Sequence, residues 1–280
     1  MKKSSSILVN KNSITSIAIG GFDGMHYAHQ QLFKNLDENG AILSIESGYA
    51  NLTPKRYRQE YSKYPIYYYV LDNIKHLEGT EFITLIKEEF PNLKKIVVGF
   101  DFCFGKNRKY CVNELKNIFN GEVIVIDEIS IDDIPIHSRH IREYLKQGDI
   151  QTANKLLGKE YKIYGIQIKG QGLGAKSFVP TINLTCEDFL LPSNGVYITK
   201  TILNENEYNS ISFIGHRTTT DGEFAIETHI LDEDIVNNDY TIQIKFFKKL
   251  RDNRKFDSFE ELKKQIDYDI NSAKEFFKGI

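Results

Sequence analysis

Two histidines stand three residues apart in the stretch GGFDGMHYAHQQL, where His26 and His29 follow a glycine-rich turn and open a helical pattern. Residues at this spacing share one face of a helix. The free N–H groups and the dipole at a helix start favour an anion there. Two imidazoles at that place suit the charge that builds up during phosphate transfer. A metal site needs a third ligand and usually a glutamate, which this stretch lacks; two solvated histidines are the remaining alternative.

A second stretch with chemical character is GQGLGAKSFVPTINL. Its alternate glycines, Gly170, Gly172 and Gly174, let backbone N–H groups approach a phosphate closely. Thr181 and Asn183 supply neutral oxygens, which suit Mg²⁺ held mainly by nucleotide phosphates and water. Glycine-rich hairpins are also common without a ligand, so the residues alone leave an ordinary hairpin open.

Alternating strand and helix patterns in the first half of the chain position the two histidines. Strand-like runs occupy residues 16–20, 41–46, 94–100 and 122–127, and helical patterns occupy 27–38 and 81–90. This order predicts parallel pairing in a doubly wound sheet. Ligands of such sheets bind beyond the carboxyl ends of the strands. The segment from Gly20 to His29 lies just past the first strand, so we expect a ligand there.

The second half of the chain has a different pattern. Residues 136–161 predict two short helices, and five strand-like runs then follow without helices between them. Such spacing predicts an antiparallel sandwich or barrel. One helix closes the chain, with a capping box formed by Ser258 and Glu261. We therefore expect two domains, 1–159 and 160–280.

Length, charge and cysteine content limit the class of protein. A chain of 280 residues fits one large domain or two ordinary ones. The formal net charge of −2 creates no overall positive field for nucleic acid or an anionic membrane, and no apolar run is long enough to span a bilayer. The three cysteines, Cys103, Cys111 and Cys186, form no CxxC pair, which predicts free thiols in a reducing, cytoplasmic compartment.

Three motifs of the first half resemble those of a known enzyme family. GGFDGMHYAHQQLF resembles the signature GxFDxxHxGH of the bacterial bifunctional riboflavin kinase/FMN adenylyltransferases. VVGFDFCFGKNRKY and IHSRHIREYLKQGDIQTANKLLG resemble that family's second and third motifs, VGxDFxFGxxxxG and SSTxIRxxLxxGxxxxAxxxLG. The three motifs occur in the family's order and at similar gaps, whereas HxGH alone would indicate only the wider nucleotidyltransferase superfamily.

The resemblance implies that the first domain is a nucleotidyltransferase that adenylylates FMN with ATP. The FMN phosphate attacks the α-phosphorus in line and pyrophosphate leaves, so catalysis is mostly positioning and charge stabilisation. His26 and His29 would stabilise the α-phosphate. The resemblance places ATP at Gly21, Phe22, Asp23, Ser138 and Arg142, and the flavin at Phe102, Phe104 and Gly105. The residues alone leave two alternatives open: Phe102 and Phe104 can be core aromatics, and Arg142 can lie on a solvated helix face.

The second half resembles the family's riboflavin kinase motifs, which implies an antiparallel β-barrel kinase with a C-terminal helix. GQGLGAKSFVPTINL resembles GxxxGxxxGFPTAN, LPSNGVYIT resembles LPxxGVY, and FIGHRTTTDGEFAIETHILD resembles the stretch with the kinase's glutamate. The implied reaction moves the γ-phosphate of ATP to the 5′-hydroxyl of riboflavin. ATP and Mg²⁺ would bind at Thr181, Asn183 and the three glycines, and Arg251 would help close the flavin pocket.

The match to the kinase's glutamate is Glu227. An attacking alcohol must lose its proton, so a carboxylate within hydrogen-bond reach is needed. On an alternating strand, Ile226 and Thr228 face one way, and Glu227 and His229 face the other. By pattern alone, Glu227 is a solvated residue on the exposed face, and the resemblance favours the base.

The chain also departs from the family's motifs. Ala28, Cys103 and Tyr110 replace glycine, arginine and glycine, HSRHIR replaces SSTRIR, and Phe178 replaces a glycine of the kinase loop. Two alternatives to a bifunctional enzyme therefore stay open. One is an enzyme with a single activity, in which the kinase is favoured because HSRHIR touches the transferase's phosphate contacts. The other is a flavin- or nucleotide-binding regulator with two degenerate sites.

Overall fold

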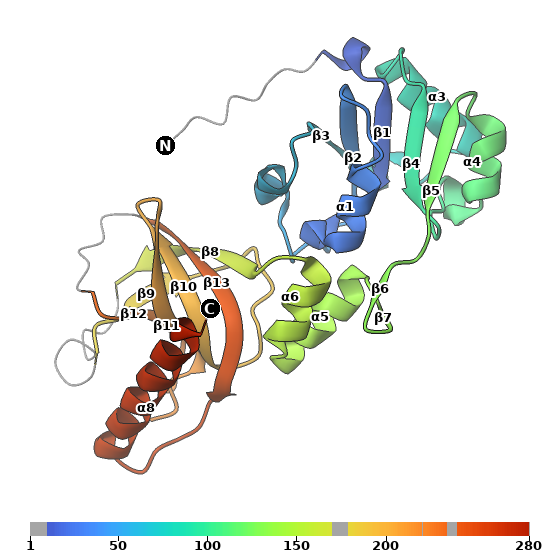
Figure 1. Ribbon diagram of the computed structural model, residues 1–280. Helices are drawn as coiled ribbons and strands as arrows, with labels where there is room; N and C mark the ends of the chain where they lie inside the picture. Colours follow the sequence, from blue (N-terminus) through green and yellow to red (C-terminus); the bar gives the residue numbers. More distant parts are fainter. Residues whose placement is uncertain (1–9, 170–178, 220, 234–239, 280) are drawn as a thin grey trace. The chain divides into compact units, whose positions relative to one another are not determined.

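The chain forms two compact units, Met1–Ser138 and Arg139–Ile280. The computed structural model describes residues 10–169, 179–219, 221–233 and 240–279. The first unit is an α/β unit and the second is built on an antiparallel β-barrel (Figure 1). Both agree with the fold that the sequence predicts.

The first unit contains a five-stranded parallel sheet in the order β3-β2-β1-β4-β5 (Figure 1). The strands are β1 (Ser16–Gly20), β2 (Gly40–Glu46), β3 (Ile66–Val70), β4 (Lys95–Gly99) and β5 (Glu122–Ile126). The strand order reverses on the two sides of β1, so the sheet is doubly wound, as predicted. This reversal is the place where such sheets bind ligands.

Strand β1 is buried on both faces, which accounts for its continuous apolar run. Ile17 and Ile19 pack into one core with Phe82, and Ala18 packs into another with Phe33. The helices of this unit are α1 (Tyr27–Phe33), α2 (Leu71–Ile74), α3 (Gly79–Glu89) and α4 (Val112–Ile118). The short elements are η1 (Lys11–Ser13), η2 (Asp23–Met25), η3 (Lys55–Tyr61), η4 (Lys106–Arg108), β6 (Ser130–Ile131) and β7 (Ile134–Pro135).

In the second unit, six antiparallel strands close into a barrel in the order β10-β11-β12-β9-β8-β13. The strands are β8 (Tyr161–Ile168), β9 (Ile182–Thr185), β10 (Gly195–Leu203), β11 (Asn206–His216), β12 (Phe224–Ile230) and β13 (Thr241–Asp252). The sequence had left a sandwich open, and pairing of β13 with β10 closes the barrel. Helix α8 (Phe259–Lys278) is capped by Ser258, whose side chain accepts a hydrogen bond from the backbone N–H of Glu261 at 3.2 Å.

Two helices, α5 (Ser138–Gln147) and α6 (Ile150–Leu157), precede the barrel. The Asn154 amide of α6 donates to the Phe246 carbonyl at 2.8 Å and accepts from the Tyr161 N–H at 2.7 Å. These bonds tie α6 to β13 and β8, so the compact unit begins before the barrel. The predicted boundary after residue 159 marks the change of sequence pattern and stays a prediction for the two catalytic domains.

Candidate active sites

The turn that follows β1 has an unusual backbone. Phe22 and Met25 have φ values of 48° and 44°, and Gly24 has a φ of 82°. Left-handed conformations cost non-glycine residues of order 1–3 kcal/mol each and persist where surrounding contacts fix them. The turn ends at His26, which is extended and caps α1. A strained turn thus delivers both histidines to the reversal point of the sheet.

The two histidines lie against each other at the start of α1. Their rings stack, with centroids 3.4 Å apart and an angle of 19° between the ring planes. His26 is buried, and its Nδ1 accepts a hydrogen bond from the backbone N–H of His29 at 3.4 Å. The ring of Phe22 meets His29 edge-on at 5.1 Å. The structure therefore brings the two histidines together, with Phe22 against His29, and their contact with a phosphate stays a prediction.

Asp23 shapes the turn through its carboxylate. The two oxygens accept hydrogen bonds from the backbone N–H groups of Asn51, Leu52 and Thr53 at 2.9–3.2 Å. The Ser138 hydroxyl donates to the Asp23 carbonyl at 2.8 Å. The structure thus brings Asp23 and Ser138 together, as the motifs imply, although they are far apart in the sequence.

The other residues predicted to bind ATP in the first domain are Gly21 and Arg142. Gly21 opens the turn, and its carbonyl oxygen accepts from Ser44 and from Arg58, both at 3.3 Å. Arg142 lies on α5, one turn after Ser138, and is half-buried. Contact of either residue with ATP stays a prediction.

The second motif forms the loop between β4 and α4. Phe104 is buried in the core beside Phe82 and stacks on Phe102 at 5.6 Å. Gly105 has a φ of 69°, and a Cβ there would lie 2.7 Å from the Tyr110 ring. These contacts support the core role that the residues alone had left open for Phe104. Flavin binding by Phe102, Phe104 and Gly105 stays a prediction.

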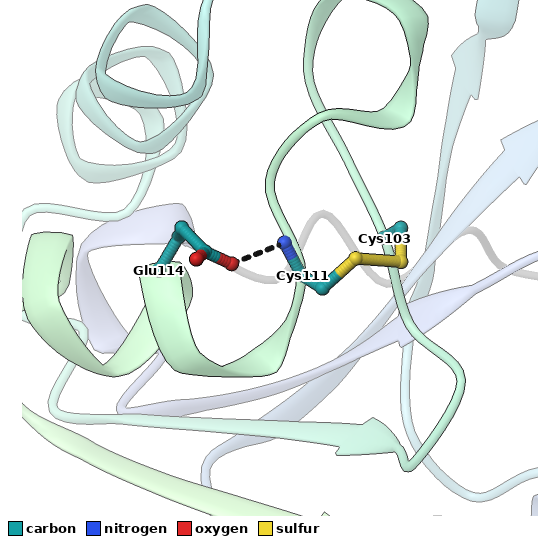
Figure 2. Close-up of a disulfide and its surroundings, with 3 residues drawn as sticks. All are labelled: Cys103, Cys111 and Glu114. Carbon is teal, nitrogen blue, oxygen red and sulfur yellow. Dashed lines mark hydrogen bonds between the residues drawn. A yellow bond between two sulfur atoms is a disulfide. The ribbon is translucent and has the colours of Figure 1, made fainter.

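The prediction of free thiols was wrong for two of the three cysteines. Cys103 and Cys111 form a disulfide in the β4–α4 loop, as Figure 2 shows, while Cys186 is free. An antiparallel bridge between Phe104 and Tyr110 folds the loop back and brings the neighbouring cysteines together. The backbone N–H of Cys111 donates to the Glu114 carboxylate at 2.8 Å. The fold of this loop brings Cys103 and Cys111 together, and their spacing in the sequence does not reveal it.

In the barrel, Glu227 and Asn183 are directly paired residues of β12 and β9. Ile226 and Thr228 are buried while Glu227 and His229 are half-exposed, which confirms the predicted alternation. Asn183 is only 8% exposed. The Nδ1 of His229 hydrogen-bonds to the Pro180 carbonyl at 2.8 Å, next to the half-buried Thr181.

The remaining kinase residues from the sequence have different outcomes. Gly170, Gly172 and Gly174 lie outside the described residues, as does Phe178. Arg251 forms an ion pair with the buried Asp269, with its Nη2 2.8 Å from the carboxylate, and so ties β13 to α8. Flavin contact by Arg251 stays a prediction.

Sequence reasoning assigned no role to Arg217, which binds the predicted base. Its Nη1 donates to Glu227 at 3.0 Å, while Nε and Nη2 donate to Asp221 at 3.0 and 2.8 Å. Desolvation pushes the pKa of Asp221 upward, but the hydrogen bonds from Arg217 outweigh it and lower that pKa below its ordinary value. Arg217 and Asp221 both lie in the stretch FIGHRTTTDGEF, but nothing in the spacing of its residues indicates that Arg217 forms ion pairs with Asp221 and Glu227.

Comparison with known proteins shows the family of both halves of the chain. Residues 157–277 match the riboflavin kinase family, and residues 49–140 match the FAD synthetase family. A bifunctional riboflavin kinase/FMN adenylyltransferase of Buchnera aphidicola (subsp. Schizaphis graminum) is 31% identical, over 96% of each chain. The chain belongs to this family. The Bacillus subtilis member is 28% identical over 98% of this chain and 96% of its own.

A solved structure extends the likeness to three dimensions. A Streptococcus pneumoniae protein, named as a macrolide-efflux protein, has a TM-score of 0.84 and 25% sequence identity to the present chain. The match covers 94% of the present chain and 97% of the Streptococcus pneumoniae chain. In the part of this chain that the structure describes, no helix has both the length and the apolar character needed to cross a membrane.

Proposed function

We propose that this protein phosphorylates riboflavin to FMN and adenylylates FMN to FAD, with ATP as the donor in both reactions. Family membership over both halves of the chain carries the proposal. Adenylyl transfer belongs to residues 1–159 and riboflavin phosphorylation to residues 160–280. The protein acts in the cytoplasm on small-molecule substrates, without nucleic-acid or membrane partners.

For adenylyl transfer, the stacked pair His26 and His29 is the group that meets the reacting phosphate. A preformed pair of imidazoles at a closed turn stabilises charge without reorganising during the reaction. Gly21, Phe22, Asp23, Ser138 and Arg142 bind or frame ATP, and Phe102, Phe104 and Gly105 line the flavin side. The reaction needs no covalent intermediate, so the protein's task is alignment of the FMN phosphate with the α-phosphorus.

For the kinase, Glu227 removes the proton from the 5′-hydroxyl of riboflavin as that oxygen attacks the γ-phosphorus of ATP and ADP leaves. Glu227 is half-exposed and lies opposite Asn183 in the neighbouring strand, which supports a base beside an oxygen ligand. The neutral oxygens of Thr181 and Asn183 suit Mg²⁺, which neutralises phosphate charge when bound. Gly170, Gly172 and Gly174 bind ATP, and Arg251 helps to close the flavin pocket.

One experiment tests the function and both alternatives. Purified protein is incubated with riboflavin, ATP and Mg²⁺, and the flavins are separated by chromatography. Successive appearance of FMN and FAD is expected. FMN without FAD would leave a kinase alone, and riboflavin binding without either product would indicate a regulator. A parallel reaction with EDTA tests the Mg²⁺ requirement.

A further inference from the structure

Arg58 is a fully buried arginine to which no motif assigns a role. It lies in η3, between β2 and β3, and its side chain is 0% exposed. Burial of a guanidinium is costly unless hydrogen bonds and a counter-charge compensate for lost water. Its partners therefore indicate what the residue is for.

The guanidinium joins three separate segments of the first unit. Its Nε donates to the Thr53 carbonyl at 2.9 Å, and its Nη1 donates to the Ser44 hydroxyl at 2.6 Å and to the Gly21 carbonyl at 3.3 Å. Nη1 also forms an ion pair with Glu46 at the end of β2. Arg58 thus holds the Gly21 peptide, at the start of the turn that follows β1, against β2 and η3.

A second set of bonds closes this arrangement into a ring. The Asp23 carboxylate accepts from the N–H of Thr53, while the Thr53 carbonyl accepts from Arg58. Arg58 in turn donates to Gly21, two residues before Asp23. We call these four residues, Gly21, Asp23, Thr53 and Arg58, the Arg58 clamp.

The clamp encloses one of the left-handed residues of the turn. Phe22 lies between Gly21 and Asp23 with a left-handed φ of 48°, and its ring meets His29 edge-on. A bulky residue holds this conformation only where contacts on both sides fix it. Movement of the Gly21 peptide would release Phe22, and with it one side of the stacked histidine pair.

We propose that Arg58 is a positioning residue for adenylyl transfer, which acts through the Gly21 carbonyl and Phe22 to fix His29. The inference rests on the proposed adenylyltransferase activity. Arg58 has no exposed surface, so it does not touch a substrate. Lysine cannot replace it, because one ammonium does not reproduce a planar fork that donates in three directions.

Three variants separate positioning from stability. Arg58→Met alone leaves Glu46 without its buried partner and can unfold the unit. The double variant Arg58→Met/Glu46→Met removes both charges and keeps apolar volume, so it is expected to fold. Arg58→Lys keeps the charge. Lys63→Met, at an exposed cation after η3, is the matched control for loss of a positive charge.

FAD formation from added FMN is measured as kcat and ATP KM, with FMN formation from riboflavin as an internal control and circular dichroism as the folding check. In the folded double variant and in Arg58→Lys, kcat for adenylyl transfer is expected to fall roughly hundredfold, a larger factor than the rise in ATP KM that follows from loosening Gly21 and Asp23. The Arg58 variants should phosphorylate riboflavin at the wild-type rate. Lys63→Met should have wild-type rates in both reactions.

Wild-type adenylyl transfer in the folded double variant would overturn the role of Arg58 while leaving the proposed function intact. An equal loss of kinase and transferase rates would show general damage and would also overturn it. A wild-type protein that forms no FAD would overturn the transferase function itself, and the inference with it.

Discussion

In the first unit the candidate site sits on an irregular turn with three positive φ angles, whereas in the second unit it sits on regular antiparallel strands. The turn is held by buried polar contacts that reach it from residues 51–58. The pair Glu227 and Asn183 is held by ladder register, which a one-residue slip would destroy because side chains alternate between faces. The first site therefore depends on a few specific side chains, and the second on the whole sheet.

The largest expected effect is on the reaction of the second unit, the phosphorylation of riboflavin. Glu227→Gln removes the general base but keeps the side-chain shape, so the rate of FMN formation should fall by roughly 10²–10⁴-fold. FAD formation from added FMN should stay at the wild-type rate. Steady-state kinetics of both reactions checks this, with Glu223→Gln, an exposed neighbour on the same hairpin, as the control. Loss of both activities in folded Glu227→Gln would refute the separation of the sites.

The matching change in the first unit is His29→Ala. Removal of one preorganised group that stabilises transition-state charge should lower the rate of FAD formation by about 10²–10³-fold. Phosphorylation of riboflavin should be unaffected. The exposed His76, changed to alanine, serves as the control. A near-normal FAD rate would mean that the stacked pair does not meet the reacting phosphate.

Arg217→Met asks how much the kinase base needs its neighbour. A hydrogen bond to a charged group contributes about 1.5–3 kcal/mol, so loss of the Glu227 contact should lower the kinase rate by roughly tenfold to hundredfold. Arg217→Lys should lie between this variant and wild type. FMN production is the measurement, and FAD production from FMN reports the unaffected unit. Unchanged FMN production would show that strand register alone orients Glu227.

The disulfide distinguishes the two units in stability. Cys103 and Cys111 are eight residues apart, and closure of a loop of this size stabilises by about 2–3 kcal/mol in the chain-entropy estimate. The double serine variant should lower the free energy of unfolding of the first unit by that amount, as should a reductant. Urea unfolding measures it, and Cys186→Ser is the control because Cys186 is free. Equal stability of oxidised and reduced protein would contradict the expectation.

The smallest effect concerns Ala28, which replaces the glycine of the family motif. Ala28→Gly should lower the stability of α1 by about 1 kcal/mol, because glycine is a poor helix former. If the methyl group crowds the nucleotide, the same change should raise the adenylyl transfer rate or the ATP affinity. Thermal melting and ATP kinetics measure the two effects. Unchanged kinetics would dispose of the crowding hypothesis.

Most of the fold could be predicted because each element carries its own periodicity. The four predicted strands of the parallel sheet lie within one residue of their observed ends. The tyrosines of residues 47–80 were predicted to be sheet aromatics, but no bounds were predicted for strand β3, since its tyrosines are half-buried and lack the apolar run of a central strand. The helix predicted over 27–38 ends as α1 at Phe33, because the chain turns after it toward Gly40.

The sequence by itself determined the two fold classes, the histidine pair and the alternation that exposes Glu227, and its motifs carry the resemblance to the family. The first three features depend on neighbouring residues in the chain, so their spacing reveals them. Only the tertiary structure decided the contacts of Arg58 with Gly21, of Arg217 with Glu227, and of Cys103 with Cys111. Such contacts join residues that chain folding brings together, and no periodicity in the sequence encodes which polar groups then meet.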